Sequence, residues 1–435
     1  MKPRKLIGFG LVLLGLTGIA GVVQAAEQAG QCEGQAAIER KERGALIGER
    51  TYRRLSSIHE QMGNEQYADA LKGLKALENG NLNDYEMAKV DETFGYVYAA
   101  QGKYSQATTY FQKALDLDAL TNASHFGLMY SLAQLYAGEE KHQKTIDLML
   151  EYMKFQCDPP PQAYIALAAS YSQLKRYDEA LPNVQTAIAK AGDKAQESWY
   201  LLELAIYFEK KNYPAAAKLL TGMVGKWPDK LKYWEMLSGA YQEQKKDIDA
   251  LSALMVAYEA GLMDKTSDSL TEKQRESKLI NLARMNLFVE VPYVAGKLLE
   301  KEMAAGRVQA NQKNLELLLS AWTSAREFDK AVATIDRLAP LKSDGELYMQ
   351  KAQLLVEKSE WQASIDAARQ ALEKGNLKAP GGAYLLIGIS ANEMRDFSQS
   401  LDALKEARKY DDKSRRQAAD WIKFVEERQQ AAAAG

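Results

Sequence analysis

The sequence contains few of the residues that build catalytic and metal centres. Among its 435 residues are only three histidines, His59, His125 and His142. None of them has a second metal-type ligand three or four residues further on, and a zinc or general-base site needs such a partner within reach. A glycine-rich phosphate loop after a strand and a serine in a nucleophile elbow are also missing. We therefore expect no catalytic residue, no metal site and no cofactor.

The sequence also lacks an excess of charge of one sign. Its formal net charge is −2, so it offers no basic face for a nucleic acid, and we expect no nucleic-acid partner. Apolar residues make up 46% and charged residues 26%, which is typical of a folded protein. A single core would normally divide at this length, whereas an array of stacked repeats can grow without that limit.

Only one long hydrophobic run is present, from Leu6 to Val23. It follows the basic residues Lys2, Arg4 and Lys5 and precedes the small-residue exit around Ala25, so residues 1–25 are expected to be a secretory signal peptide. An uncleaved membrane anchor is the alternative, because a run of this length can just span a bilayer. The expected location is the periplasm of a Gram-negative bacterium, without stable membrane insertion after cleavage.

Cysteine is nearly absent, with only Cys32 and Cys157. In an oxidising compartment an even count permits one disulfide bond. Two unpaired thiols are the alternative, and the spacing matches no metal motif.

The stretch from Gln162 to Ala187 predicts two short helices joined by a turn. Apolar residues recur at three and four residues in each helix, and Ala168 and Ala180 are small where the two backbones must approach. This is the tetratricopeptide (TPR) pattern, which repeats about every 34 residues. Similar units begin near residues 51, 88, 126, 161, 197, 231, 276, 312, 345 and 381.

The repeats predict an all-α fold, a TPR solenoid that forms a right-handed superhelix. Residues 26–50 are expected to be a basic N-terminal segment or helix with its charges in solvent, and about ten TPR-like repeats follow over 51–411. A polar loop insertion near 262–275 interrupts them. Residues 412–435 should form a capping helix, ending near Arg428, and a frayed tail.

Several short phrases go beyond the general repeat pattern. They include Tyr-Asp-Glu-Ala-Leu-Pro at 177–182, Glu-Ser-Trp-Tyr at 197–200, Lys-Tyr-Trp at 232–234 and Asp-Gly-Glu-Leu-Tyr at 344–348. In these the sequence resembles the periplasmic tetratricopeptide proteins found with TonB–ExbB–ExbD energy-transduction systems of gammaproteobacteria. The resemblance implies a scaffold or adaptor in TonB-dependent transport through the outer membrane, with periplasmic segments of the TonB-type complex as partners. It supplies no functional residues.

The first helix of each repeat should line a groove that binds protein segments. Its exposed positions lack the Lys and Asn set of a carboxylate clamp and instead carry apolar and small residues, which suit a segment with apolar anchors. The candidate contacts are Tyr96, Tyr130, Leu201, Phe208, Met349 and Leu385. The alternative is that these side chains only pack between neighbouring helices.

Three classes of function remain open from the sequence. The first is the TonB-associated adaptor, and the second is a general cell-envelope scaffold for outer-membrane assembly, secretion or peptidoglycan remodelling. The third, an enzyme or its regulatory arm, is disfavoured by the missing catalytic groups. Neither the partner's identity nor the oligomeric state follows from the sequence.

Overall fold

A computed structural model describes residues 40–264 and 271–434 of the chain. Within these ranges the regular structure is α-helical, apart from two short 3₁₀ turns at Gly192–Lys194 and Ala339–Leu341, and it includes no β-strand. The expected all-α repeat solenoid is therefore confirmed. The expected signal peptide and Cys32 lie outside the described residues. The signal peptide and the pairing of Cys32 with Cys157 therefore stay predictions.

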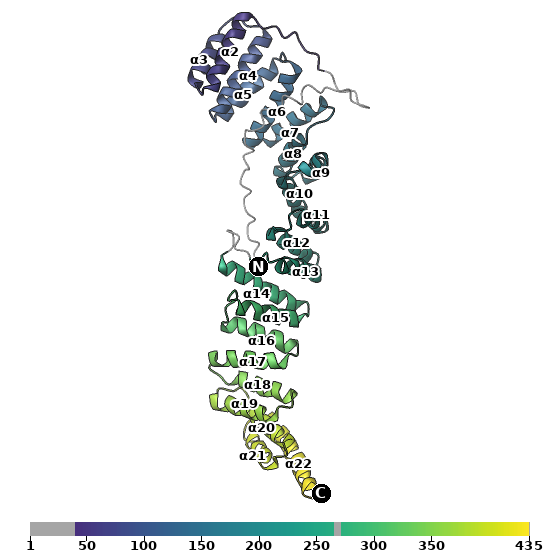
Figure 1. Ribbon diagram of the computed structural model, residues 1–435. Helices are drawn as coiled ribbons and strands as arrows, with labels where there is room; N and C mark the ends of the chain where they lie inside the picture. The colour runs from purple at the N-terminus through teal and green to yellow at the C-terminus, as the bar shows by residue number, and fades with distance from the viewer. Residues whose placement is uncertain (1–39, 265–270, 435) are drawn as a thin grey trace. The chain divides into compact units, whose positions relative to one another are not determined.

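The helices follow one another in sequence order, each packed on the next within its unit (Figure 1). Their bounds are α2 (Glu49–Gly63), α3 (Tyr67–Glu78), α4 (Asp84–Ala100), α5 (Tyr104–Asp116), α6 (Asn122–Gly138), α7 (His142–Lys154), α8 (Pro161–Gln173), α9 (Tyr177–Ala191), α10 (Glu197–Glu209), α11 (Tyr213–Lys226), α12 (Leu231–Glu243), α13 (Asp247–Glu259), α14 (Glu272–Phe288), α15 (Pro292–Ala304), α16 (Gln312–Ser324), α17 (Phe328–Leu338), α18 (Glu346–Glu357), α19 (Trp361–Lys374), α20 (Pro380–Glu393), α21 (Phe397–Ala407) and α22 (Asp412–Ala434).

The even-numbered helices from α2 to α20 begin close to the ten repeat starts expected from the sequence. We call these the A helices, and the odd-numbered helix that follows each one is its B helix. The chain divides into two compact units, Met1–Leu219 and Leu220–Gly435, called unit 1 and unit 2. The right-handed path of the superhelix through both units stays a prediction.

The turn between the A and B helices has the same geometry in every repeat. In the fourth repeat Lys175 has a φ of 60°, and the next amide, that of Arg176, donates to the carbonyl of Tyr171 at 2.8 Å. This is the Schellman arrangement that satisfies the last carbonyls of a helix. The equivalent residues with positive φ are Glu65, Gly102, Glu140, Lys211, Lys245, Glu290, Arg326, Ser359 and Arg395.

The two helices of a repeat approach most closely at small residues. Ala168 and Ala180 are both fully buried. In the second repeat the space above Gly95 is filled by the ring of Phe111, since a Cβ there would lie 2.2 Å from Phe111 Cδ1. The A and B helices can therefore touch only because a side chain is missing at this position.

Some repeats carry a hydroxyl where the pattern favours alanine. Thr145 Oγ1 donates to the carbonyl of Ala133 at 3.2 Å, and Ser400 Oγ donates to that of Gly388 at 2.7 Å. Each bond runs from the B helix to the A helix of the same repeat, across twelve residues. A hydroxyl at the close approach is thus satisfied without water, which removes the cost of burying it.

Residues 40–48 form an extended strap along the N-terminal ends of α4 and α6, and the first helix begins only at Glu49. Arg40 Nε donates to Asp118 Oδ1 at 2.8 Å, and its Nη1 donates to the carbonyl of Leu120 at 2.8 Å and to Asn122 Oδ1 at 2.9 Å. The side chain of Arg40 is only 7% exposed, so the expectation of a solvated basic face is wrong for this residue. An arginine with three acceptors from a neighbouring loop is an anchor, not a solubilising charge.

A buried carboxylate links the two repeats on either side of the expected insertion in unit 2. Glu302 of α15 is completely buried and accepts from Tyr258 Oη of α13 at 2.7 Å and from Arg307 Nη2 at 2.9 Å. Burial acts to raise the pKa of Glu302, but the hydrogen bonds from Arg307 and Tyr258 outweigh it and leave the pKa below its usual value. Residues 265–270 of the insertion lie outside the described part of the chain.

The last helix, α22, packs on the tenth repeat. Val425 is fully buried, and Arg428 Nη1 lies 3.0 Å from Glu393 Oε1 of α20. The helix continues to Ala434, past Arg428, where we expected it to end. Fraying of the tail stays a prediction.

The close approach at Gly95 leads to a stability prediction. Gly95→Ala should lower the free energy of unfolding by about 1–3 kcal/mol, because the added methyl group overlaps the ring of Phe111. Gly127→Ala in α6 is the matched control, since no atom lies within 4 Å of the Cβ position there and alanine favours the helix by up to about 1 kcal/mol. Urea unfolding followed by circular dichroism compares the two. Equal midpoints would refute the packing argument.

The strap leads to a prediction about pH. Burial, and then the charge of Arg40, lower the pKa of His125 to about 4, while Asp118 opposes them. The unfolded chain binds this proton below about pH 6.5 and the folded chain does so only near pH 4. The folded chain therefore keeps its full free energy of unfolding above pH 6.5, where His125 is neutral in both states. Part of this free energy is lost as the pH falls to 4, because only the unfolded chain takes up the proton. On acidification, the free energy of unfolding of His125→Gln should therefore fall by up to about 3 kcal/mol less than that of the wild type. The free energies of unfolding of the wild type and the variant are measured at pH 7.5 and 4.5. If both proteins lose the same amount between these values, the prediction is wrong.

Candidate protein-binding surface

Four half-buried side chains occupy successive A helices of unit 1. They are Tyr96 on α4, Tyr130 on α6, Ile165 on α8 and Leu201 on α10, and we call them the A-helix row. Tyr96, Tyr130 and Ile165 all pack against one core cluster. The repeat spacing therefore brings residues that are far apart in sequence onto successive helices. Three of the candidate contacts, Tyr96, Tyr130 and Leu201, lie in this row.

The two tyrosines of the row rest on other aromatic rings. The ring centroid of Tyr96 lies 5.0 Å from that of Phe111, edge to face, and that of Tyr130 lies 6.0 Å from that of Tyr152. Tyr152 in turn contacts Phe126, with the centroids 6.4 Å apart. Rings held in this way lose little conformational freedom when they bind a partner, which favours their use as anchors.

The hydroxyl groups of the row remain neutral. Burial, and then the charge of Glu92, raise the pKa of Tyr96 to about 12, while a hydrogen bond with Ser131 opposes them. Burial also raises the pKa of Tyr130, against a hydrogen bond with Gln134. Both phenols can therefore exchange hydrogen bonds with a polar group of a bound segment over the whole physiological pH range.

One end of the row is polar and the other is apolar. On α4 Glu92 is only 6% exposed and forms an ion pair with Lys89 of the same helix. On α8 and α10 the row continues with aliphatic side chains and with Ala169 and Ala205, which are small and half-buried. A segment lying along the row would thus meet a charged pair first and a hydrophobic strip after it.

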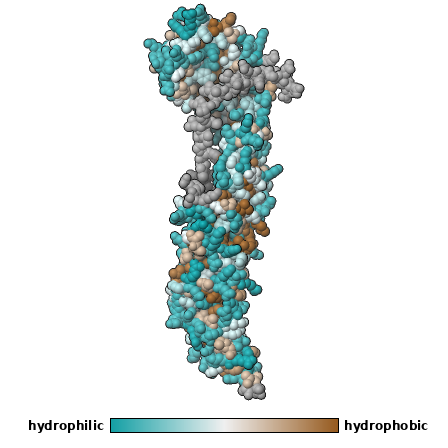
Figure 2. Space-filling view, in the orientation of Figure 1, coloured by the Kyte–Doolittle hydropathy of each residue, from teal (hydrophilic) through white to brown (hydrophobic). Residues whose placement is uncertain are grey.

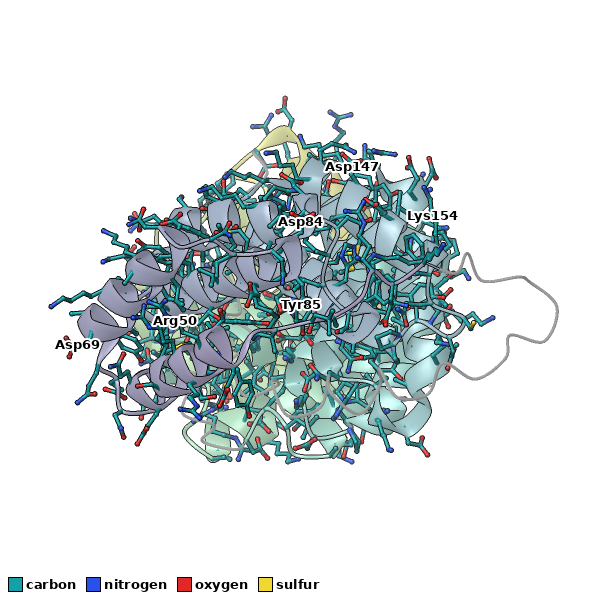
Figure 3. The ribbon with its side chains drawn as sticks, turned by 90° about the horizontal axis from the view of Figure 1, so that it is seen from above. Arg50, Asp69, Asp84, Tyr85, Asp147 and Lys154 are labelled. Atoms are coloured by element: carbon teal, nitrogen blue, oxygen red, sulfur yellow. The ribbon has the colours of Figure 1, made fainter. Side chains whose placement is uncertain are left out.

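The B helices of unit 1 present a different surface. Asp147 and Lys154 of α7 are exposed and can be followed in the view from above (Figure 3). The face of the molecule seen in Figure 2 is mainly hydrophilic, with hydrophobic patches of limited extent. Single apolar side chains are nevertheless exposed on B helices as well, at Tyr104 of α5 and Leu150 of α7.

The remaining candidates are not joined to the row. Phe208 is half-buried and its ring contacts Tyr213, with the centroids 6.2 Å apart, at the turn between α10 and α11. In unit 2 Met349 is half-buried against the core of the ninth and tenth repeats. Leu385 is only 8% exposed and packs with Leu404 and Ala407. For Leu385 the structure thus matches the alternative of packing between helices.

Unit 2 contains an apolar pocket that the sequence reasoning missed. It has a volume of about 260 Å³ and is lined by residues of α12, α13 and α14 together with the following Val289. Phe288 lines it and is 73% exposed, and Ile248 of α13 is 72% exposed. The missed signal for the pocket is Phe288, a large apolar residue that lies outside the buried stripe of α14.

Metal-ligand clusters and membrane spans were also looked for in the described residues. Over 40–264 and 271–434 there is no group of three His, Cys, Asp or Glu side chains that could hold a metal ion. Within the same ranges no helix combines the length and the hydropathy needed to cross a bilayer.

Comparison with known proteins agrees with the repeat architecture. A family model described as "Tetratricopeptide repeat" matches residues 165–254, the stretch from α8 to α13. No curated protein matches the chain. The match and the ten helix pairs together identify the chain as a TPR solenoid.

Three solved structures illustrate the similarity. A MamA crystal structure is 15% identical with a TM-score of 0.36, covering 43% of this chain and 97% of its own. YrrB, titled a TPR protein with an unusual peptide-binding site, is 14% identical with a TM-score of 0.34, covering 42% and 90%. A TPR protein from Parabacteroides merdae is 15% identical with a TM-score of 0.36, covering 63% and 99%. At these scores they carry no argument about function.

Proposed function

We propose that this chain is a non-catalytic interaction scaffold of the periplasm that binds protein segments along the A-helix row of unit 1. The observation that carries the proposal is the row itself, in which half-buried apolar side chains recur on four successive helices. Grooves of this kind bind partners by a few apolar anchors, and affinity concentrates in well-supported aromatic residues. Tyr96 and Tyr130 fit that role.

The proposed system is TonB-dependent transport across the outer membrane, with the chain as an accessory component. Support comes from the sequence phrases shared with periplasmic TPR proteins of TonB–ExbB–ExbD systems and from the expected signal peptide. The preferred ligand is a periplasmic segment of TonB or ExbD that places a basic or polar group near Glu92 and apolar side chains along α8 and α10. A general envelope scaffold would use the same row for another partner.

A binding experiment with purified components tests both the A-helix row as the binding surface and the TonB-type complex as the partner. Tyr130→Ser together with Leu201→Ser should weaken the binding of the periplasmic segments of TonB and ExbD by about 30- to 1,000-fold, because the two lost anchors contribute about 1–2 kcal/mol each. Leu150→Ser is the matched control, since Leu150 is an apolar residue of the B helix α7 with 42% exposure. It should bind like the wild type.

The measurement is fluorescence anisotropy with each labelled segment, after circular dichroism has shown that the variants are folded. If neither segment binds the wild-type chain, the TonB assignment is wrong. If a segment binds the folded double variant as tightly as the wild type, the A-helix row is not the binding surface.

A further inference from the structure

The turns of the sixth and seventh repeats carry large apolar side chains in solvent. Phe288, the last residue of α14, is 73% exposed, and Val291 in the turn after it is 39% exposed. Ile248 and Tyr293, each the second residue of its B helix, are 72% and 46% exposed. We call these four residues the apolar edge of unit 2.

The equivalent positions of the other repeats are small or polar. Among the described B helices, a large apolar residue stands at the second position only in the sixth and seventh repeats. The A helices end without a large apolar residue in every repeat but the seventh, so the repeat fold does not require Phe288, and an exposed apolar cluster of this kind marks a contact surface. The last residues of the other nine A helices are Gly63, Ala100, Gly138, Gln173, Glu209, Glu243, Ser324, Glu357 and Glu393.

The pocket of about 260 Å³ in unit 2 lies beside Phe288 and is preformed. Gln242 Nε2 of α12 donates to Met285 Sδ of α14 at 3.8 Å, and Asn281 Nδ2 donates to the same sulfur at 3.7 Å. The thioether that lines the pocket is therefore held by two amides. An apolar cavity of about 150 Å³ is large enough to bind benzene, so this pocket can receive an aromatic ring.

The rim of the pocket carries one charge of each sign. Asp247 at the start of α13 and Arg284 of α14 both line it, and within the described residues neither takes part in an ion pair. The surface thus offers an aromatic side chain beside a pocket for one, and a cation beside an anion. Such a surface is complementary to itself, which is what a twofold symmetric dimer needs, because every contact across the axis occurs twice.

We propose that the chain forms a twofold symmetric dimer through unit 2, in which Phe288 of each copy enters the pocket of the other. Arg284 of one copy then faces Asp247 of the second copy on both sides of the axis. The rest of the apolar edge surrounds the two rings and excludes water from them. The edge is rigid at Tyr293, whose ring centroid lies 5.8 Å from that of the buried Trp322.

The size of the apolar edge sets the strength of the dimer. An aromatic side chain buries about 150–250 Å² at most, so four partly exposed side chains offer on the order of a few hundred Å² of apolar surface. A standard interface covers about 800 Å² on each partner. We therefore expect a reversible dimer with a dissociation constant in the micromolar range. Each dimer carries two A-helix rows, so it can bind two partner segments at once.

The first experiment measures the mass of the purified chain by sedimentation velocity. Between about 1 and 100 μM the wild type should pass from monomer to dimer. Phe288→Glu should weaken the dimer at least about tenfold, because a carboxylate does not enter an apolar pocket. Glutamate ends four other A helices, so α14 should stay folded, and circular dichroism checks this.

Tyr52→Glu is the matched control for Phe288→Glu, since Tyr52 is an aromatic residue of α2 in unit 1 with 60% exposure. It should form dimers like the wild type. A wild-type chain that remains monomeric at about 100 μM, or a folded Phe288→Glu variant that forms dimers as readily as the wild type, would overturn the proposal.

The second experiment tests whether the occupant of the pocket is a second copy of this chain. Arg284→Asp and Asp247→Arg should each weaken the dimer about tenfold or more, because each variant brings like charges together on both sides of the axis. An equimolar mixture of the two variants should regain the affinity of the wild type, since every contact in the mixed dimer joins an arginine to an aspartate. If the mixture forms dimers no better than the separate variants, the two copies do not meet at this pocket and the proposal is wrong.

Discussion

Each repeat depends on one constraint, the close contact of two helix backbones at a position with almost no side chain. The contact buries the apolar stripes of both helices, but it leaves one face of the pair uncovered until the next repeat packs on it. Gly95 with Phe111, and Ala168 with Ala180, show how little space is available. Where the chain has a larger residue at this contact, as at Thr145, the hydroxyl bonds to the opposite helix and the spacing is preserved.

The many tyrosines follow from the same constraint. A small contact between backbones leaves room on both sides for broad rings, and the cations of the turns lie over them. The guanidinium carbon of Arg176 lies 4.7 Å from the ring centre of Tyr171, and Lys141 Nζ lies 5.7 Å from that of Tyr136. A turn that must adopt positive φ thus also supplies a charge that covers the ring beside it. On the A helices the same abundance of rings provides the candidate binding surface.

The order of the helices could be predicted from the sequence because each repeat is a local pattern of three- and four-residue spacings. The surface was less predictable, since the pattern marks which face a residue lies on but not how deeply the next repeat covers it. Tyr130 is half-buried at the repeat position where the last full repeat has Leu385, which is buried. The strap was missed for a related reason. Arg40 lies among other basic residues, and only its long-range contacts with Asp118 and Asn122 distinguish it from Arg43.

The strap also imposes an order of events on folding. Arg40 is synthesised before its acceptors Asp118 and Asn122, which follow about eighty residues later. Until that length of chain has emerged, the segment has no binding site, and the first two helix pairs must form without it. Docking of the strap therefore reports that the third repeat has begun to fold, and it is among the last long-range contacts that the N-terminal repeats acquire.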